Sequence, residues 1–160
     1  VFQESIAFDD TIANNIRMGN PDADDEAMRK AASAAGALSF IENTPNGFDT
    51  RVGQSGSMLS VGQKLRISIA RGLVSDAPIL ILDEPTAALD PETENALVSA
   101  LQTERARRLL VVIAHRLSTI RSADKIVFVD QGRILETGSH DELMAIEDGA
   151  YRRFVELQVG

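Results

Sequence analysis

Two short apolar segments constrain the fold of this chain more than any other feature. Ile79 to Leu82 and Leu109 to Ala114 contain only apolar residues, and a helix candidate from Pro91 to Ala106 separates them. Short, continuous apolar runs are typical of strands in a parallel sheet that helices cover. The order strand, helix, strand therefore predicts an α/β fold in which both strands lie in one parallel sheet and are fully buried.

The chain before Pro78 differs, because its apolar residues recur at helical spacing. Acidic residues near the start of a segment and turn residues near its end mark the expected boundaries. Two turn signals predict a loop over Thr44 to Ser57. The predicted helices are Asp9 to Met18, Asp24 to Ala35, Ala37 to Asn43 and about Ser60 to Leu73.

The last part of the chain predicts a hairpin followed by two helices. Asp130 to Gly132 has the composition of a tight turn, and apolar segments flank it on both sides. We therefore expect strands over Lys125 to Val129 and Arg133 to Glu136. Helices are predicted over His140 to Ile146 and Gly149 to Gln158.

The composition is that of one ordinary folded domain. Of the 160 residues, 44% are hydrophobic and 25% are charged, which argues against a disordered or fibrous chain. The formal net charge of -8 argues against nucleic acid as a partner, because binding to phosphate backbones depends on clustered Lys and Arg. Cysteine is absent, which excludes disulfides and thiolate metal sites. No apolar run approaches the roughly 20 residues that cross a bilayer.

The first residues do not resemble a natural start. Residue 1 is Val, and Val1 to Gln3 has the pattern of a strand that is already under way. The segment Val1 to Phe8 also lacks the basic region and the long apolar stretch of a signal peptide. We therefore expect the N-terminus to be a cut rather than the beginning of a protein.

Two adjacent carboxylates follow the first apolar strand. Asp83 and Glu84 come directly after Ile79 to Leu82, at the edge where parallel α/β sheets bind their ligands. One carboxylate at this edge can hold Mg²⁺, and a second can orient or deprotonate a water that attacks a phosphoryl group. The alternative is a strand that ends in a polar turn, with Pro85 stopping the ladder. The residues alone favour neither interpretation.

Two further segments are helix starts with polar side chains. Asp90 and Pro91 fit the N-cap and the first position of a helix, which does not exclude a second role for Asp90 at a subunit contact. Ser60 and Gln63 fit a capping box. The same helix start, with the Ser60 hydroxyl and the flexible Gly62, can receive a phosphate because its N–H groups are unpaired.

Three polar residues carry weaker signals. His115 follows Leu109 to Ala114 at the same expected sheet edge as Asp83. There it can donate a hydrogen bond to a γ-phosphate or hold the attacking water, although a single histidine is more often structural. His140 lies at a predicted helix start and is expected at the surface. Gln3, at the end of the opening strand, is uninformative by itself.

The order and spacing of these segments resemble the nucleotide-binding domains of ATP-binding cassette (ABC) proteins over nearly the whole chain. Each motif is moderately specific, whereas five of them in this order are very specific. They are Val1 to Gln3, which resembles the Q-loop, Leu59 to Gln63, the signature segment, Ile79 to Glu84, the Walker B strand, Ala88 to Asp90, the D-loop, and His115, the switch histidine.

Three more segments resemble the exporter branch of this family. Phe8 to Ile16 follows the Q-loop as it does in exporters, and Thr50 to Gly53 resembles the X-loop that couples exporter domains. Asp130 to Leu143 is typical of the same branch. We therefore expect the parent protein to be a bacterial-type exporter.

Two features depart from the family pattern. Val61 stands in the signature segment where the family usually has Gly, which removes backbone freedom close to a phosphate. The phosphate loop, G-x-x-x-x-G-K-[ST], is missing from the 160 residues. The closest segment, residues 56–64, has the wrong spacing. This chain alone is therefore expected to have negligible ATPase activity and, with an apolar sheet edge exposed, to aggregate.

The resemblance implies an incomplete P-loop NTPase fold, in which a RecA-like parallel sheet core is joined to the α-helical signature subdomain. The helical subdomain would cover about residues 9–75 and the core about residues 76–160. Within the core's own ATP site, the resemblance makes Glu84 the general base and His115 a second catalytic residue. Gln3 and Asp83 would hold Mg²⁺.

The resemblance also implies partners. Ser60, Gly62 and Gln63 would complete the ATP site of a second nucleotide-binding domain packed head to tail, and Asp90 would lie at this contact. The transmembrane domain of the exporter would be the other partner, at the cytoplasmic face of the plasma membrane (the bacterial inner membrane). Two alternatives stay open: a soluble ABC ATPase, which the acidic charge disfavours, and a catalytically silent structural module.

Overall fold

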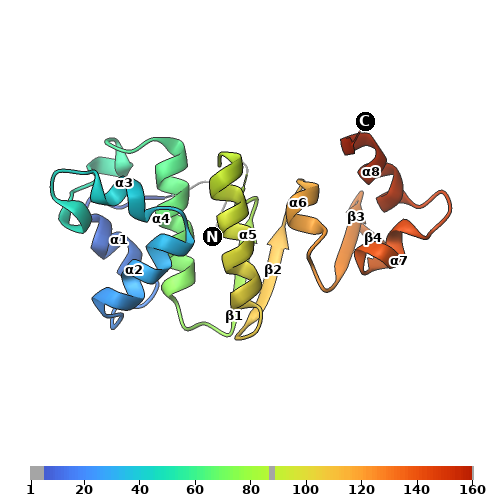
Figure 1. Cartoon of the computed structure of the whole chain (residues 1–160), viewed down its shortest axis with the longest axis horizontal. Helices are drawn as coiled ribbons and strands as arrows, with labels where there is room; N and C mark the ends of the chain where they lie inside the picture. The colour runs from blue at the N-terminus through green and yellow to red at the C-terminus, as the bar shows by residue number, and fades with distance from the viewer. Residues whose placement is uncertain (1–5, 87–88, 160) are drawn as a thin grey trace. The chain divides into compact units, whose positions relative to one another are not determined.

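The computed structural model describes residues 6–86 and 89–159 (Figure 1). The chain forms two compact units, of which the first ends at Ile113 and the second begins at Ala114. The division near residue 75 that the sequence predicts lies inside the first unit and stays a prediction. No helix within the two described ranges combines the length and the apolar character needed to cross a membrane.

Within its described residues, the first unit contains every helix and strand that the sequence predicts there, together with two short 3-10 helices in the predicted loop. The strand predicted at Val1 to Gln3 lies outside the described residues. Most boundaries differ by one to three residues, because capping residues precede the first helical turn. The elements are α1 (Ile12–Arg17), α2 (Asp25–Ala34), α3 (Leu38–Glu42), η1 (Gly47–Asp49), η2 (Gln54–Gly56), α4 (Val61–Val74), β1 (Ile79–Asp83), α5 (Pro91–Glu104) and β2 (Leu109–Ile113).

Short polar side chains fix where the first two helices begin. The Thr11 hydroxyl accepts the N–H of Asn14 at the start of α1, and the Asp24 carboxylate accepts the N–H of Ala27 at the start of α2. These bonds satisfy N–H groups that have no partner within a helix. The predicted start of α1 at Asp9 was therefore three residues too early.

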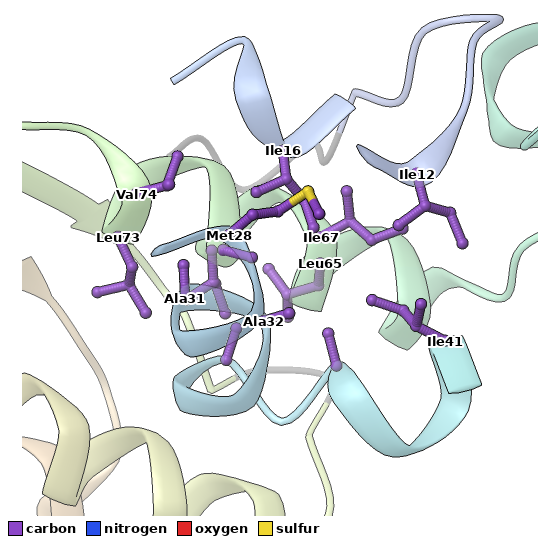
Figure 2. Close-up of a cluster of buried hydrophobic side chains, with 14 of the residues drawn as sticks. Ile12, Ile16, Met28, Ala31, Ala32, Ile41, Leu65, Ile67, Leu73 and Val74 are labelled. Carbon is purple, nitrogen blue, oxygen red and sulfur yellow. The ribbon is translucent and has the colours of Figure 1, made fainter. Parts of the chain in front are cut away.

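The helices of the first unit enclose an aliphatic core (Figure 2). Ile12 and Ile16 of α1 and Ile41 of α3 are 0% exposed, and Ile67 of α4 is 1% exposed. Gly19, which follows α1, allows this close packing, because a Cβ atom there would lie 1.9 Å from the carbonyl oxygen of Arg71. Burial on this scale removes the apolar surface of α1, α2 and α4 from water.

Arg71 on α4 ties the segment before α1 to the helices. Its guanidinium donates to the Asn15 carbonyl at 2.7 Å, to Asn15 Oδ1 at 3.0 Å and to the Ile6 carbonyl at 3.0 Å. The Asn15 side chain is fully buried and also bonds the N–H and the C=O of Phe8. Burial lowers the pKa of Arg71 below its usual range. The network therefore holds residues 6–8 against α1 and α4.

The strands β1 and β2 form the parallel pair that the sequence predicts, with α5 as the connection. The register runs from Ile79 opposite Leu109 to Asp83 opposite Ile113. The predicted full burial was wrong, because one face of this pair is open: Ile79, Ile81 and Leu109 are 53%, 52% and 60% exposed. Alternate side chains of a strand point to opposite faces, and the described helices cover only one of them.

The second unit consists of α6 (Leu117–Ile120), β3 (Ile126–Asp130), β4 (Arg133–Gly138), α7 (His140–Met144) and α8 (Ala150–Val159). The predicted hairpin is confirmed, since β3 and β4 pair antiparallel around a turn in which Gln131 and Gly132 have positive φ. The helix α6 was not predicted, because its N-cap Arg116 makes no side-chain capping bond.

An aromatic cluster forms the core of the second unit. Tyr151 is 0% exposed, and its ring meets that of Phe128 edge-on with centroids 6.1 Å apart. The Tyr151 hydroxyl lies 2.8 Å from Nδ1 of His140, so this half-buried histidine contacts the edge of the core and is not the free surface residue that the sequence predicts. The Glu136 carboxylate accepts the N–H groups of Ala150 and Tyr151 and so fixes the start of α8.

Candidate functional site

The carboxyl end of β1 carries the two predicted acidic residues. Asp83 is the last residue of the strand and pairs in register with Ile113 at the end of β2. The N–H of Glu84 then donates to the Ile113 carbonyl at 2.9 Å. Both carboxylates are half-buried. They therefore stand at the edge of the parallel pair where α/β proteins bind their ligands, as the sequence predicts.

Glu84 has a backbone conformation that the sequence did not indicate. Its φ is +44°, in the left-handed region that residues with a Cβ atom rarely adopt. This conformation costs about 1–2 kcal/mol. Because Pro85 follows, the backbone angles open to Glu84 are restricted further. The bond to Ile113 and the burial of Pro85 and Thr86 hold it in place. Strain of this kind concentrates at functional sites, which makes Glu84 a candidate functional residue.

The signature segment forms the start of α4 through the predicted capping box. The Ser60 hydroxyl accepts the N–H of Gln63 at 3.2 Å, and Gln63 Oε1 accepts the N–H of Ser60 at 2.9 Å. Val61 is 73% exposed and Gly62 is half-buried. This helix start therefore lies at the surface, and the partial positive charge of a helix N-terminus is open to an anionic ligand from outside the unit.

Asp90 is the N-cap of α5, as predicted, with Pro91 at the first helical position. Its carboxylate accepts the N–H of Thr93 at 2.9 Å and the Thr93 hydroxyl at 2.8 Å. These two bonds lower the pKa of Asp90 from 3.8, and the charge of Arg66 adds to the effect. Asp90 is therefore a fixed negative charge at neutral pH.

Arg66 is a residue that sequence reasoning missed at this site. From the second turn of α4, its guanidinium donates to the carbonyls of Gly62 and Gly36 and lies over the Phe40 ring, 5.3 Å from the centroid. A Cβ atom on Gly36 would lie 2.6 Å from the Thr93 side chain of α5, so the bond from Arg66 to Gly36 places the second turn of α4 near the start of α5. In the sequence, the signal for a side chain that makes these contacts would be a basic residue one turn after the signature segment.

His115 belongs to the second unit, two residues beyond the end of β2 in the chain. It is exposed, and its carbonyl oxygen accepts a hydrogen bond from the Gln158 side chain of α8. Gln3 and Ala88 of the predicted Q-loop and D-loop lie outside the described residues. Leu89, which precedes Asp90, is buried.

Magnesium is the metal that the predicted site implies. Among residues 6–86 and 89–159, no three acidic or histidine side chains gather into a cluster that would hold a metal by themselves. Mg²⁺ is typically bound by one or two carboxylates together with water and the phosphates of a nucleotide. The single carboxylate of Asp83, a hard oxygen donor at the sheet edge, fits that kind of site.

Three comparisons with known proteins all find similarity to ABC transporters. The family model described as ABC transporter matches residues 1–87. An ATP-dependent lipid A-core flippase from Desulfotalea psychrophila is 53% identical over 158 residues, which cover 99% of this chain and 27% of that protein. A beta-(1→2)glucan export ATP-binding/permease protein from Rhodopseudomonas palustris is 56% identical over 145 residues, which cover 91% of this chain and 24% of that protein.

A solved structure shares the fold. It is described as a bacterial Atm1-family ABC exporter with ATP bound, and it superposes with a TM-score of 0.90 at 43% sequence identity. The match covers 99% of this chain and 27% of that chain. The chain thus spans about a quarter of the length of these relatives.

Proposed function

The chain belongs to the ABC transporter family, and we propose that it is part of the ATP-hydrolysing domain of an exporter in that family. The observation that carries the proposal is the carboxyl end of β1. There, Asp83 and Glu84 lie at the ligand-binding edge of a parallel pair, and Glu84 is held in a left-handed conformation. The relatives described as a flippase and as an export protein support the exporter branch.

Glu84 acts as the general base in the proposed reaction. Its carboxylate accepts a proton from a water whose oxygen attacks the γ-phosphorus of ATP, and the bond from that phosphorus to the β,γ-bridging oxygen breaks. The products are ADP and inorganic phosphate. The hydrogen bond from Glu84 N–H to Ile113 and the buried Pro85 fix the backbone that carries this carboxylate. His115 donates a hydrogen bond to the γ-phosphate or holds the attacking water.

Asp83 and Gln3 hold Mg²⁺ in this proposal. When bound there, Mg²⁺ would neutralise negative charge on the phosphates of the nucleotide. Asp83 is suited to the role because it ends β1 and is half-buried, which keeps its carboxylate at the sheet edge. Because Asp83 and Glu84 are adjacent in the chain, one strand end supplies both the metal ligand and the base.

Ser60, Gly62 and Gln63 contribute to a second ATP site, that of a partner nucleotide-binding domain packed head to tail. The surface position of the α4 start supports this, because Val61 is 73% exposed there and the partial positive charge of a helix N-terminus favours a phosphate from another chain. Asp90 lies at the proposed contact between the domains. It caps α5 by bonding Thr93, whose side chain lies beside Gly36, the residue that Arg66 bonds. Hydrolysis in this scheme requires the dimer.

The transmembrane domain of the same exporter is the other proposed partner, which places the chain at the cytoplasmic face of the bacterial inner membrane. ATP-driven association of two such domains then moves the membrane domain. The net charge of -8 supports a protein partner over nucleic acid.

The proposal is tested in the full-length protein that contains this chain. Glu84→Gln keeps the size of the side chain but removes the base, so the turnover number for ATP should fall by about 100-fold or more, while ATP binding persists. Glu92→Gln, which alters an exposed glutamate in the first turn of α5, is the matched control and should hydrolyse ATP normally. Normal turnover in Glu84→Gln would refute the role of Glu84. A wild-type protein that binds ATP without hydrolysing it would instead be the silent module.

A further inference from the structure

Gln158 on α8 makes two hydrogen bonds to the backbone that carries His115. Its side-chain Nε2 donates to the His115 carbonyl, and its Oε1 accepts the N–H of Leu117 at 3.2 Å. One carboxamide thus bonds the C=O of one residue and the N–H of the residue two positions later, as a neighbouring strand would. This pair of bonds fixes the orientation of the chain between residues 115 and 117.

The bond to Leu117 also supplies the capping hydrogen bond that α6 lacks at its start. This four-residue helix begins at Leu117, and its N-cap Arg116 makes no side-chain capping bond. The first N–H groups of a helix have no partner within the helix and need one from elsewhere. Gln158 provides it from a distance of 41 residues along the chain. The start of α6, and with it the segment directly after His115, is therefore held by α8.

The helix α8 is a firm support for Gln158, because its own position is fixed in the second unit. Tyr151 and Val155 are 0% and 6% exposed, and the Glu136 carboxylate bonds the first N–H groups of the helix. Tyr151, Val155 and Gln158 are spaced by four and three residues, so they share one face of α8. The packing that anchors α8 therefore also directs the Gln158 side chain toward the backbone of His115 and Leu117.

We propose that Gln158 is a positioning residue for the reaction, which holds the His115 backbone and so restricts the orientations from which the imidazole can reach the γ-phosphate or the attacking water. This inference rests on the proposed function and extends it, because α8 then takes part in ATP hydrolysis without touching ATP. Small errors in the placement of a catalytic group cost turnover more than substrate binding. Loss of Gln158 should therefore lower the turnover number and leave the KM for ATP nearly unchanged.

A double-mutant cycle in the full-length protein tests this inference. Gln158→Ala should lower the turnover number by about threefold to tenfold, the size expected for the loss of a modest hydrogen-bond contribution. The same substitution in a His115→Ala background should have no further effect, because nothing is left to position. Gln158→Glu, which can still accept the Leu117 N–H but cannot donate to His115 when ionised, should also lose turnover.

Glu156→Gln is the matched control, since this exposed side chain lies on the same helix and bonds only Arg152 among the interactions described for it. It should hydrolyse ATP normally. Hydrogen exchange of residues 115–120 gives a second readout, and it should become faster in Gln158→Ala while exchange in β3 and β4 stays the same.

Two results would overturn the inference. One is an equal loss of turnover from Gln158→Ala in both backgrounds, which would indicate a general structural role. The other is unchanged turnover in Gln158→Ala despite faster exchange. If His115→Ala hydrolyses ATP normally while Glu84→Gln does not, the positioning role fails and the proposed function stands. If Glu84→Gln is also normal, the proposed function itself fails.

Discussion

The strands of the first unit are more apolar than its helices, yet their side chains are less completely buried. Ile67 on α4 is 1% exposed, whereas Ile81 on β1 is 52% exposed. The helices α1, α2 and α4 present one apolar stripe each, and they pack these stripes against one another. The pair β1 and β2 has two apolar faces, of which the described elements cover one. Apolar content alone therefore does not determine burial; the number of faces that need cover does.

The largest expected effect is a direct test of this contrast. Ile67→Ala should destabilise the protein by about 2–5 kcal/mol, because it leaves a cavity in a closed core. Ile81→Ala should cost below about 1 kcal/mol, because the side chain is already half in water. Guanidinium unfolding of the two variants measures both changes. Equal losses would mean that the open face of β1 is covered in solution.

The buried polar network of the helices should rank next. Asn15→Ala removes bonds to Phe8 and Arg71 and leaves buried groups unpaired, so we expect a loss of about 2–4 kcal/mol. Asn14→Ala is the matched control, because this neighbouring side chain is exposed and should cost below about 1 kcal/mol. The same unfolding experiment serves, and a small effect of Asn15→Ala would show that water replaces its partners.

A smaller and opposite effect is expected at the end of β1. Glu84→Gly should stabilise the protein by about 0.5–1 kcal/mol, because glycine adopts positive φ without a steric penalty. It should also abolish ATP hydrolysis in the full-length protein. Glu84→Ala keeps a Cβ atom and so should lose activity without the gain in stability. A fall in the melting temperature of Glu84→Gly would contradict the strain assigned to this residue.

The smallest expected effect concerns the starts of α1 and α5. Each has an aspartate whose pKa is lowered by hydrogen bonds, so the helical region and the sheet region are alike in this respect. Hydrogen bonds from Thr11 and Asn14 lower the pKa of Asp10, and those from Thr93 lower the pKa of Asp90, both from 3.8. A lowered folded-state pKa means that the stabilisation is complete above 3.8 and is lost as the pH falls through the lower folded value. Asp90→Asn should therefore flatten the acid limb of the stability curve between about pH 5 and about pH 2. An unchanged acid limb would show that Thr93 does not bond the carboxylate in solution.

The elements that the sequence predicts well are those with local causes. The capping box of Ser60 and Gln63, the N-cap at Asp90 and the turn at Gly132 each depend on residues at most a few positions apart. The signature segment and the pair Asp83 and Glu84 were recognised for the same reason, since each is a continuous stretch of sequence. The helix α6 was missed because its capping partner, Gln158, is remote.

The sequence by itself determined the order of the helices and strands, their caps, and which polar residues end each strand, because hydrogen bonds between near neighbours form in any context. Only the tertiary structure decided which face of β1 is covered, that Arg66 bonds Gly36 beside the start of α5, that Glu84 is strained, and that Gln158 bonds the His115 carbonyl. The physical reason is that each of these features depends on contacts between elements distant in the sequence. Such contacts exist only after the chain has packed.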